Sequence, residues 1–311
     1  MTLPTLPRAR WSGLALLALT AWLAVAPAEA APKAELWERW TAHDPASSTV
    51  VDHSAWDALL AGRVVQGTGG VALVRYGRFG AAERQALDGY LAALQAVAVS
   101  RLNRDEQFAY WVNLYNALTV KVILDNYPVE TIRDIDISPG LFSNGPWGAE
   151  LVEVEGEALS LDDIEHRILR PIWQDPRIHY AVNCASIGCP DLRATAWTAE
   201  GLDAALDEAA RRYVNHPRGA DVRGGRLYVS SIYDWFEEDF GDSEAGVIAH
   251  LRQYAASGLK NRLVGIRDIE DDEYDWTLND AAPRPRAEPR VRRGSQTLNN
   301  GRTGGPGEGG S

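Results

Sequence analysis

Two cysteines lie close together in the segment 177–190, RIHYAVNCASIGCP, which also contains His179. Cys184 and Cys189 are the only thiols among the 311 residues of the chain. Two thiols at this spacing suit a disulfide, part of a metal site or a nucleophile with a neighbouring thiol. The residues around them have to distinguish these three chemistries.

The first interpretation makes Cys184 a nucleophile, with His166 or His179 as its base. Glu165 would orient the imidazole and stabilise its charged form. This arrangement is typical of enzymes that cleave amides, peptides or esters, or that transfer acyl groups. The candidate donors to the developing oxyanion or to the substrate are the amides of Asn183, Asn113 and Asn116.

The other two interpretations need no catalysis. In an exported protein, Cys184 and Cys189 would most simply form a disulfide, which would staple a binding or structural module. For a metal site, the spacing from His179 through Cys184 to Cys189 matches no common zinc pattern. We therefore expect neither a metal nor a cofactor.

The pair Glu165-His166 lies on a predicted helix, 161–170, that Ser160 caps together with Asp163. Glu165 falls inside the apolar arc of this helix, and an unpaired buried charge is unfavourable, so it needs a cation, a histidine or a proton. One alternative is a structural ion pair with a buried arginine. We expect the helix to end before Pro171.

A second predicted helix begins at Asn103, where Glu106 completes a capping-box pattern, and its residues are apolar on nearly all sides. Such a helix is buried on nearly all sides. Asn113 and Asn116 share one face of it, and buried amides need hydrogen-bond partners. They either bridge to neighbouring backbone or line a polar pocket.

The alternation in residues 177–184 predicts a strand with His179 and Cys184 on opposite faces, which favours His166 as the base. The acidic run 237–239 is typical of a solvated helix face, and His53 and His250 have no features that distinguish them from surface residues. Together the patterns predict an α+β fold, a single domain over residues 31–280 with helices packed on a small, mostly antiparallel sheet. Further predicted elements are a short strand at 71–76, a helix at 82–98, a hairpin at 150–161, a helix at 198–215, a strand at 226–229 and a last strand at 274–278.

The N-terminus indicates export. Residues 1–30 combine arginines with an apolar run of 16 residues and the pattern Ala28-Glu29-Ala30, as in a cleaved signal peptide. The run is shorter than the roughly 20 residues that cross a bilayer. We expect a periplasmic or secreted protein with no transmembrane span.

Charge limits the partners. The net charge is −12 over the whole chain, and an acidic protein is a poor ligand for nucleic acid. The segment 281–311 is rich in Gly, Pro and Arg and is predicted to be disordered. Its arginines could make weak contact with anionic envelope surfaces.

Five ordered motifs resemble those of the bacterial domain-of-unknown-function 547 family: AYWVNLYNALTVK at 109–121, LSLDDIEHRILRP at 159–171, DPRIHYAVNCASIGCPDLR at 175–193, LYVSSIYDWFEEDFG at 227–241 and YDWTLN at 274–279. The resemblance implies no activity, because the family is named for its lack of one. The chain has Val51-Asp52-His53 where the family pattern reads Val-Asp-Tyr, so a role for a phenol there does not carry over.

The sequence therefore favours a thiol-dependent hydrolase or acyltransferase of the cell envelope, with an unidentified small molecule or peptide as substrate. The competing hypothesis is a non-catalytic envelope module with a Cys184–Cys189 disulfide.

Overall fold

The computed structural model describes residues 32–140 and 145–282. The predicted signal peptide (1–30) and nearly all of the predicted disordered tail (281–311) lie outside these residues. The helices are α1 Ser54–Arg63, α2 Ala81–Gln95, α3 Arg104–Asn126, α4 Arg170–Trp173, α5 Leu202–Val214, α6 Ile232–Trp235, α7 Glu244–Tyr254 and α8 Ser257–Arg262. The strands are β1 Val64–Gln66, β2 Ala72–Val74, β3 Val152–Val154, β4 Glu157–Leu159, β5 Ala220–Arg223, β6 Arg226–Ser230 and β7 Asp271–Glu273.

The strands form three small sheets, β1-β2, β3-β4 and β5-β6-β7. Every pairing is antiparallel except that of β6 with β7. The predicted α+β class, with mostly antiparallel strands, is confirmed. We expected one sheet and the structure has three, because each strand is short and pairs mainly with its neighbour in the chain.

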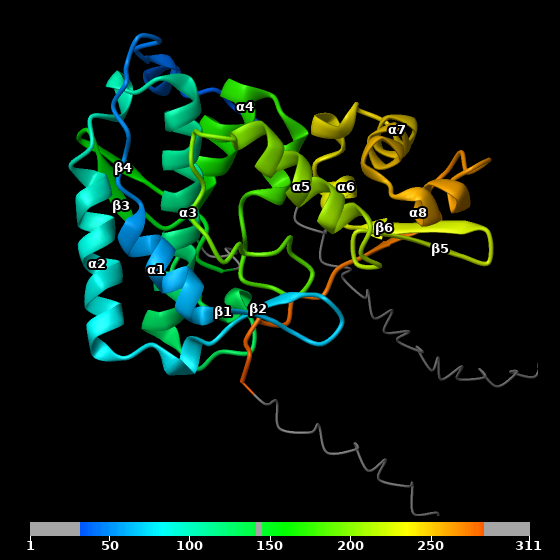
Figure 1. The fold of residues 1–311 in the computed structure, drawn as a ribbon, viewed down its shortest axis with the longest axis horizontal. Helices are drawn as coiled ribbons and strands as arrows, with labels where there is room; N and C mark the ends of the chain where they lie inside the picture. The colour runs from blue at the N-terminus through cyan, green and yellow to red at the C-terminus, as the bar shows by residue number, and fades with distance from the viewer. Residues whose placement is uncertain (1–31, 141–144, 283–311) are drawn as a thin grey trace, which may run out of the picture.

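Helix α3 is the central element of the larger core, and its residues are buried almost throughout, as its apolar sequence predicts. Figure 1 shows it beside α1 and α2, with the β3-β4 hairpin in the same part of the molecule. The Asn103 side chain caps it by accepting a hydrogen bond from the Glu106 backbone N–H at 2.9 Å. The capping box is incomplete, however, because the Glu106 carboxylate accepts from the Val51 N–H at 2.6 Å instead.

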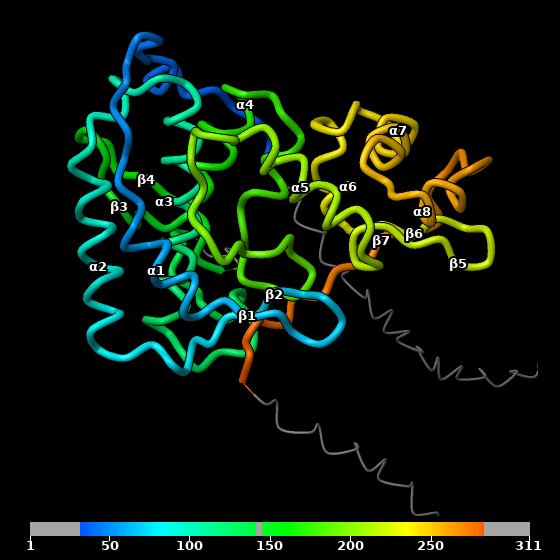
Figure 2. Tube along the Cα trace, viewed as in Figure 1, coloured from blue at the N-terminus to red at the C-terminus, as the bar shows by residue number. Residues whose placement is uncertain are grey.

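A second buried cluster forms around β5, β6 and α7. Figures 1 and 2 show these elements and α8 on the opposite side of the molecule from α2, with α5 between the two parts. Ala209 of α5 packs against both clusters. The domain boundaries 31–280 stay a prediction.

The predicted strand at 177–184 is wrong. Residues Pro176–Tyr180 form a 3-10 helix, whose start is fixed by the Asp175 carboxylate accepting from the Arg177 N–H at 2.9 Å. The Ala181 N–H continues these local bonds to the Ile178 carbonyl at 2.8 Å. The backbone groups of this segment bond to nearby residues and to the Asn116 side chain instead of to a neighbouring strand. The two-face argument for His179 and Cys184 falls with the strand.

The last predicted strand, 274–278, is also wrong: β7 ends at Glu273, and Leu278 forms an isolated bridge to Ser186 instead of a continuous ladder. Residues 274–280 are nevertheless well anchored, and we call them the C-terminal segment. Asn279 N–H donates to the Ala185 carbonyl at 3.0 Å, and Val74 N–H donates to the Asn279 carbonyl at 2.8 Å. The segment thus links the loop at residues 183–190, which we call the thiol loop, to β2. Figure 2 shows the segment, in orange, passing from the three-stranded sheet to the β1-β2 hairpin.

Candidate functional site

The loop that carries Cys184 is held in an unusual backbone conformation. Ala185, immediately after the thiol, has φ = 59°, which a residue with a Cβ rarely adopts. The Asn183 side chain fixes this turn, because its oxygen accepts from the Ala185 N–H at 3.0 Å and its amide donates to the Pro190 carbonyl at 2.6 Å. Left-handed non-glycine residues of this kind are concentrated at functional sites.

The Cys184 sulfur lies among hydroxyl groups. It is 3.2 Å from Ser186 Oγ and 3.0 Å from the Tyr274 hydroxyl, which is supplied by the C-terminal segment. Burial opposes ionisation of the thiol, but hydrogen bonds from Cys189, Ser186 and Tyr274 outweigh it and lower the pKa of Cys184. The thiolate is therefore the form that these groups favour.

Cys189 is the buried neighbour of this thiol. Both cysteines are free, and the Cys184 backbone N–H lies 2.9 Å from Cys189 Sγ. Burial and the negative charge of Cys184 raise the pKa of Cys189 well above its ordinary value. The two thiols thus have unequal roles in this structure: Cys184 is the acidic thiol and Cys189 a hydrogen-bonding partner.

Glu165 and His166 lie on a π-helical segment, Asp163–Leu169, that runs directly into α4. The predicted cap is present, since the Asp163 N–H donates to Ser160 Oγ at 3.1 Å. The helical run does not end at Pro171 as predicted. Pro171 lies inside this continuous run and has no N–H to donate, and the N–H groups of Glu35 and Trp37 donate instead to the His166 and Arg167 carbonyls, at 2.9 and 3.0 Å. Single π turns inside helices are frequent at functional sites.

His166 is held by Arg170. Arg170 Nη1 lies 3.1 Å from His166 Nδ1, and a guanidinium can only donate, so Nδ1 accepts and the neutral ring carries its hydrogen on Nε2. Burial, opposed by Glu165 and assisted by Arg170, lowers the pKa of His166 to about 4. His166 is therefore neutral at pH 7.

His179 lies between two carboxylates. Its Nε2 is 2.7 Å from Asp239 and its Nδ1 is 3.7 Å from Glu165. Although burial opposes the charge, the bonds to Asp239 and Glu165 raise the pKa of His179. The same contacts help to lower the pKa of both Glu165 and Asp239 to about 2, against the effect of burial. Glu165 and Asp239 are thus carboxylates at neutral pH, and they favour the charged form of His179.

Arg170 completes this cluster, and its side chain is only 1% exposed. It contacts Asp239 at 2.6 Å and Glu238 at 2.7 Å, and donates to the Pro32 carbonyl at 2.7 Å. The expectation that the acids 237–239 form a solvated face is therefore wrong for Asp239, whose side chain is 20% exposed, whereas Glu238 is exposed although it pairs with Arg170. Phe236, from the same stretch, stacks on His179 with ring centroids 4.4 Å apart.

The thiols and the side chains of Glu165, His166 and His179 meet at the wall of one cavity of about 550 Å³. Its wall includes five of the predicted residues, namely Cys184, Cys189, Glu165, His166 and His179. Aromatic side chains form much of the remainder: Tyr115, Trp147, Trp235, Phe236, Tyr274 and Trp276. Within residues 32–140 and 145–282, no hydrogen bond joins the Cys184 sulfur to an imidazole; its polar neighbours are Ser186, Tyr274 and Cys189.

The three predicted amides serve the framework of the site and do not line the cavity. Asn113 exchanges two hydrogen bonds with the Trp197 backbone, at 2.8 and 3.0 Å. Asn116 donates to the Ala181 carbonyl at 3.0 Å and accepts from the Asn183 N–H at 2.8 Å. Asn113 and Asn116 thus bridge to backbone, which is one of the two alternatives that the sequence left open. None of the three amides faces the cavity, as an oxyanion donor would have to.

Replacing Asn116 by Ala should destabilise the protein by about 1–3 kcal/mol, because it leaves two buried backbone groups without partners. Urea denaturation would measure this change. Asn126 is the control, since its exposed amide bonds only the Val122 carbonyl of its own helix at 2.9 Å. An Asn116→Ala effect no larger than that of Asn126→Ala would contradict the framework role.

Two features are absent from the described residues. These residues contain no group of three or more His, Cys, Asp and Glu side chains arranged to hold a metal ion. They also contain no helix with the length and apolarity that a membrane span requires.

The fold and the site define an α+β protein with an acidic thiol in an aromatic-lined cavity. Residues 99–214 match the model of the family described as "Protein of unknown function, DUF547". The resemblance read from the motifs is confirmed over this segment, which contains α3, the π-helical segment and the thiol loop. The motifs at 227–241 and 274–279 lie beyond the matched residues. No curated protein and no solved structure matches the chain.

Acid should destabilise the protein before its carboxylates titrate. His53 and His250, which we expected at the surface, are buried, and burial lowers their pKa, like that of His166, to about 4. Because the unfolded chain binds these protons near pH 6.5, stability is complete above that pH and is lost as pH falls toward 4. Each histidine should contribute on the order of 1–3 kcal/mol. The raised pKa of His179 has the opposite effect, since it adds stability as pH falls. This gain is fully present below pH 6.5 and does not offset the loss between pH 6.5 and pH 4.

Urea denaturation at pH 7, 5.5 and 4 would test this expectation. His53→Asn should reduce the loss of stability over this range, whereas His43→Asn, at an exposed position, should not. A free energy of unfolding that stays constant from pH 7 to pH 4 would show that the three imidazoles are not held neutral.

Proposed function

We propose that this protein is a thiol-dependent hydrolase or acyltransferase of the cell envelope, with Cys184 as its nucleophile. The observation that carries the proposal is the lowered pKa of Cys184 at the wall of a cavity of about 550 Å³. A thiolate reacts where a thiol does not, and a cavity of this size accommodates a small molecule or a peptide end. The sequence of residues 1–30 supports the envelope location.

In this proposal Ser186, Tyr274 and Cys189 favour the thiolate that starts the first step. Cys184 Sγ attacks the acyl carbon, and the bond to the leaving group breaks as that group takes a proton. Water or an acceptor molecule then attacks the thioester, loses a proton and releases Cys184. The net reaction is hydrolysis or acyl transfer, with no oxidation or reduction.

The charge states favour His179 over His166 as the group that exchanges this proton. The pKa of His179 is raised, which favours the imidazolium that can donate a proton, whereas the pKa of His166 is lowered and its Nδ1 accepts from Arg170. Glu165 and Asp239 would stabilise the charged form of His179, as the sequence suggested for Glu165. The aromatic wall would hold an apolar part of the substrate.

The test combines thiol reactivity with a panel of activated esters, amides and thioesters. Native full-length protein should form one adduct with iodoacetamide near neutral pH, on Cys184. Activity on a panel substrate should fall on the order of 10³-fold or more in Cys184→Ser. Cys189→Ser keeps a hydroxyl donor beside Cys184 and should lower activity by about tenfold or less. Tyr228→Phe, outside the cavity, is the control that should leave activity unchanged.

The competing function is a non-catalytic module stapled by a Cys184–Cys189 disulfide, and the contact between the two cysteines is the observation that favours it. Two thiols that become reactive only after reduction, together with no activity of the native protein on the panel, would establish the module and end the catalytic proposal.

A further inference from the structure

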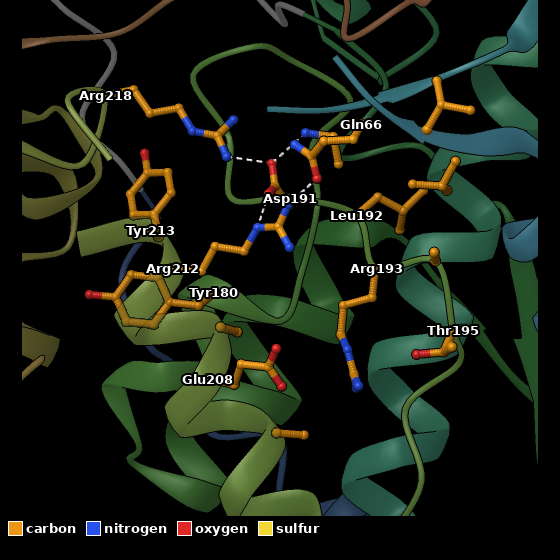
Figure 3. Close-up of a pocket in the computed structure, with 16 residues that line it drawn as sticks. Gln66, Tyr180, Asp191, Leu192, Arg193, Thr195, Glu208, Arg212, Tyr213 and Arg218 are labelled. Carbon is orange, nitrogen blue, oxygen red and sulfur yellow. Dashed lines mark hydrogen bonds and ion pairs between the residues drawn. The ribbon is translucent and has the colours of Figure 1, made fainter. Parts of the chain in front are cut away.

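A second cavity, of about 390 Å³, lies between the β1-β2 hairpin, helix α5 and residues 191–195 (Figure 3). None of the candidate catalytic residues lines it. Its polar wall contains three arginines, Arg193, Arg212 and Arg218, and two acids, Asp191 and Glu208. In a chain with a net charge of −12, a cavity with an excess of guanidinium groups is a distinct electrostatic environment.

Each carboxylate oxygen of Asp191 forms an ion pair with an arginine. Arg212 Nε lies 2.6 Å from one of its carboxylate oxygens, and Arg218 binds the other. The second oxygen also accepts from the Ala72 N–H at 2.9 Å. Figure 3 shows both arginines converging on this carboxylate, so two guanidinium groups share one negative charge.

Arg193, the third arginine of this cavity, takes no part in the ion pairs with Asp191. Its guanidinium lies 4.5 Å from the centroid of the Trp197 ring, and in the described part of the chain it has neither an ion pair within 4.0 Å nor a hydrogen bond. Figure 3 shows Arg193 and Glu208 extending toward the same space from opposite walls. Glu208 is an exposed side chain and therefore a hydrated, weak counter-charge.

The chemistry of Arg193 indicates what would fill this space. A guanidinium presents N–H donors in a planar fork that matches a carboxylate or a phosphate. Partial burial against Trp197 fixes the group and makes its lack of a partner unfavourable. Apolar side chains on the same cavity wall would accept a hydrocarbon portion: Val64, Leu192, Ala205 and Ala209.

We propose that this cavity binds a small organic anion, a carboxylate or phosphate monoester with an aliphatic part, whose charged group pairs with Arg193. The site is separate from the thiol cavity, although the two share a loop: Cys189 and Pro190 line the first cavity, and Asp191, Leu192 and Arg193 line the second. The proposal does not depend on catalysis by Cys184, and Cys184→Ser should bind the anion as the native protein does.

Isothermal titration calorimetry of the full chain at low ionic strength, with hexanoate and hexyl phosphate as probes, would test this site. At least one of the two anions should bind, and their relative affinities would show which charged group the site prefers. Hexylammonium and hexanol should bind at least tenfold more weakly. Arg193→Gln should weaken the better anion at least tenfold, whereas Arg211→Gln, an exposed arginine of α5 that pairs with Asp207, should change it less than twofold.

Glu208→Gln gives a test that loss of folding cannot imitate. Removing the negative charge opposite Arg193 should tighten anion binding several-fold. The proposal is overturned if neither anion binds the native protein, if Arg193→Gln and Arg211→Gln weaken binding equally, if hexylammonium binds as well as the anions, or if Glu208→Gln leaves their affinity unchanged.

Discussion

Replacing Arg170 by Met should lower the free energy of unfolding by about 3–5 kcal/mol, because it removes a cation from a buried ion cluster and leaves the acidic partner behind. The Arg170 side chain is 1% exposed and contacts Asp239 at 2.6 Å. Without it, Asp239 keeps only His179 as a cationic partner, and the Pro32 carbonyl loses its donor. Urea denaturation followed by tryptophan fluorescence would measure the change.

Arg167→Met is the matched control, since Arg167 lies one helical turn before the cluster and its side chain is 40% exposed. It pairs with Asp163 at 2.8 Å, and exposed pairs of this kind contribute about 1 kcal/mol or less. Equal effects of the two substitutions would mean that the cluster around Arg170 is hydrated in solution and is not a buried strut.

The second large effect concerns the thiolate. Tyr274→Phe removes the hydroxyl 3.0 Å from the Cys184 sulfur and should raise the pKa of Cys184. A hydrogen bond to a charged group contributes about 1.5–3 kcal/mol, equivalent to roughly a ten- to hundredfold change in thiolate population. Because a more basic thiolate is also a better nucleophile, we expect alkylation near pH 7 to slow by about tenfold overall.

The measurement is the rate of iodoacetamide alkylation as a function of pH. Ser186→Ala should act in the same direction, because Ser186 Oγ lies 3.2 Å from the sulfur. Tyr228→Phe, on β6 and outside the cavity, should leave the pH profile unchanged. Superimposable profiles for native protein, Tyr274→Phe and Ser186→Ala would show that the hydroxyls do not hold the thiolate.

Sequence patterns predicted well the elements whose stability is local. The apolar run of α3, its Asn103 cap and the hairpin around Gly156 all depend on neighbours in the chain. The Ser160–Asp163 cap also depends on neighbours in the chain. It begins the helical run that carries Glu165 into the interior. The buried arginine that the sequence admitted as a partner for this region is present, but it binds Asp239 and Glu238 directly, and His179 lies between Asp239 and Glu165.

Features that depend on distant residues were not predictable in this way. Alternating apolar residues in 177–184 resemble a strand, yet Asp175 and Pro176 start a 3-10 turn there, and the core accepts the side chains from either backbone. Asp239 and Tyr274 reach the site from 60 and 90 residues away, and no local pattern distinguishes them from solvated residues. The same long-range pairing explains the burial of His250, which bonds the Tyr180 hydroxyl at 2.7 Å.

The position of the C-terminal segment has a consequence for biosynthesis. The Tyr274 hydroxyl and the Asn279 backbone complete the surroundings of Cys184 and Ala185, and Tyr274 follows the thiol by 90 residues in the chain. A nascent polypeptide that has not yet reached these residues lacks a principal stabiliser of the thiolate. The sulfur would therefore stay a weakly acidic thiol until the C-terminal segment has been made and has docked beside it.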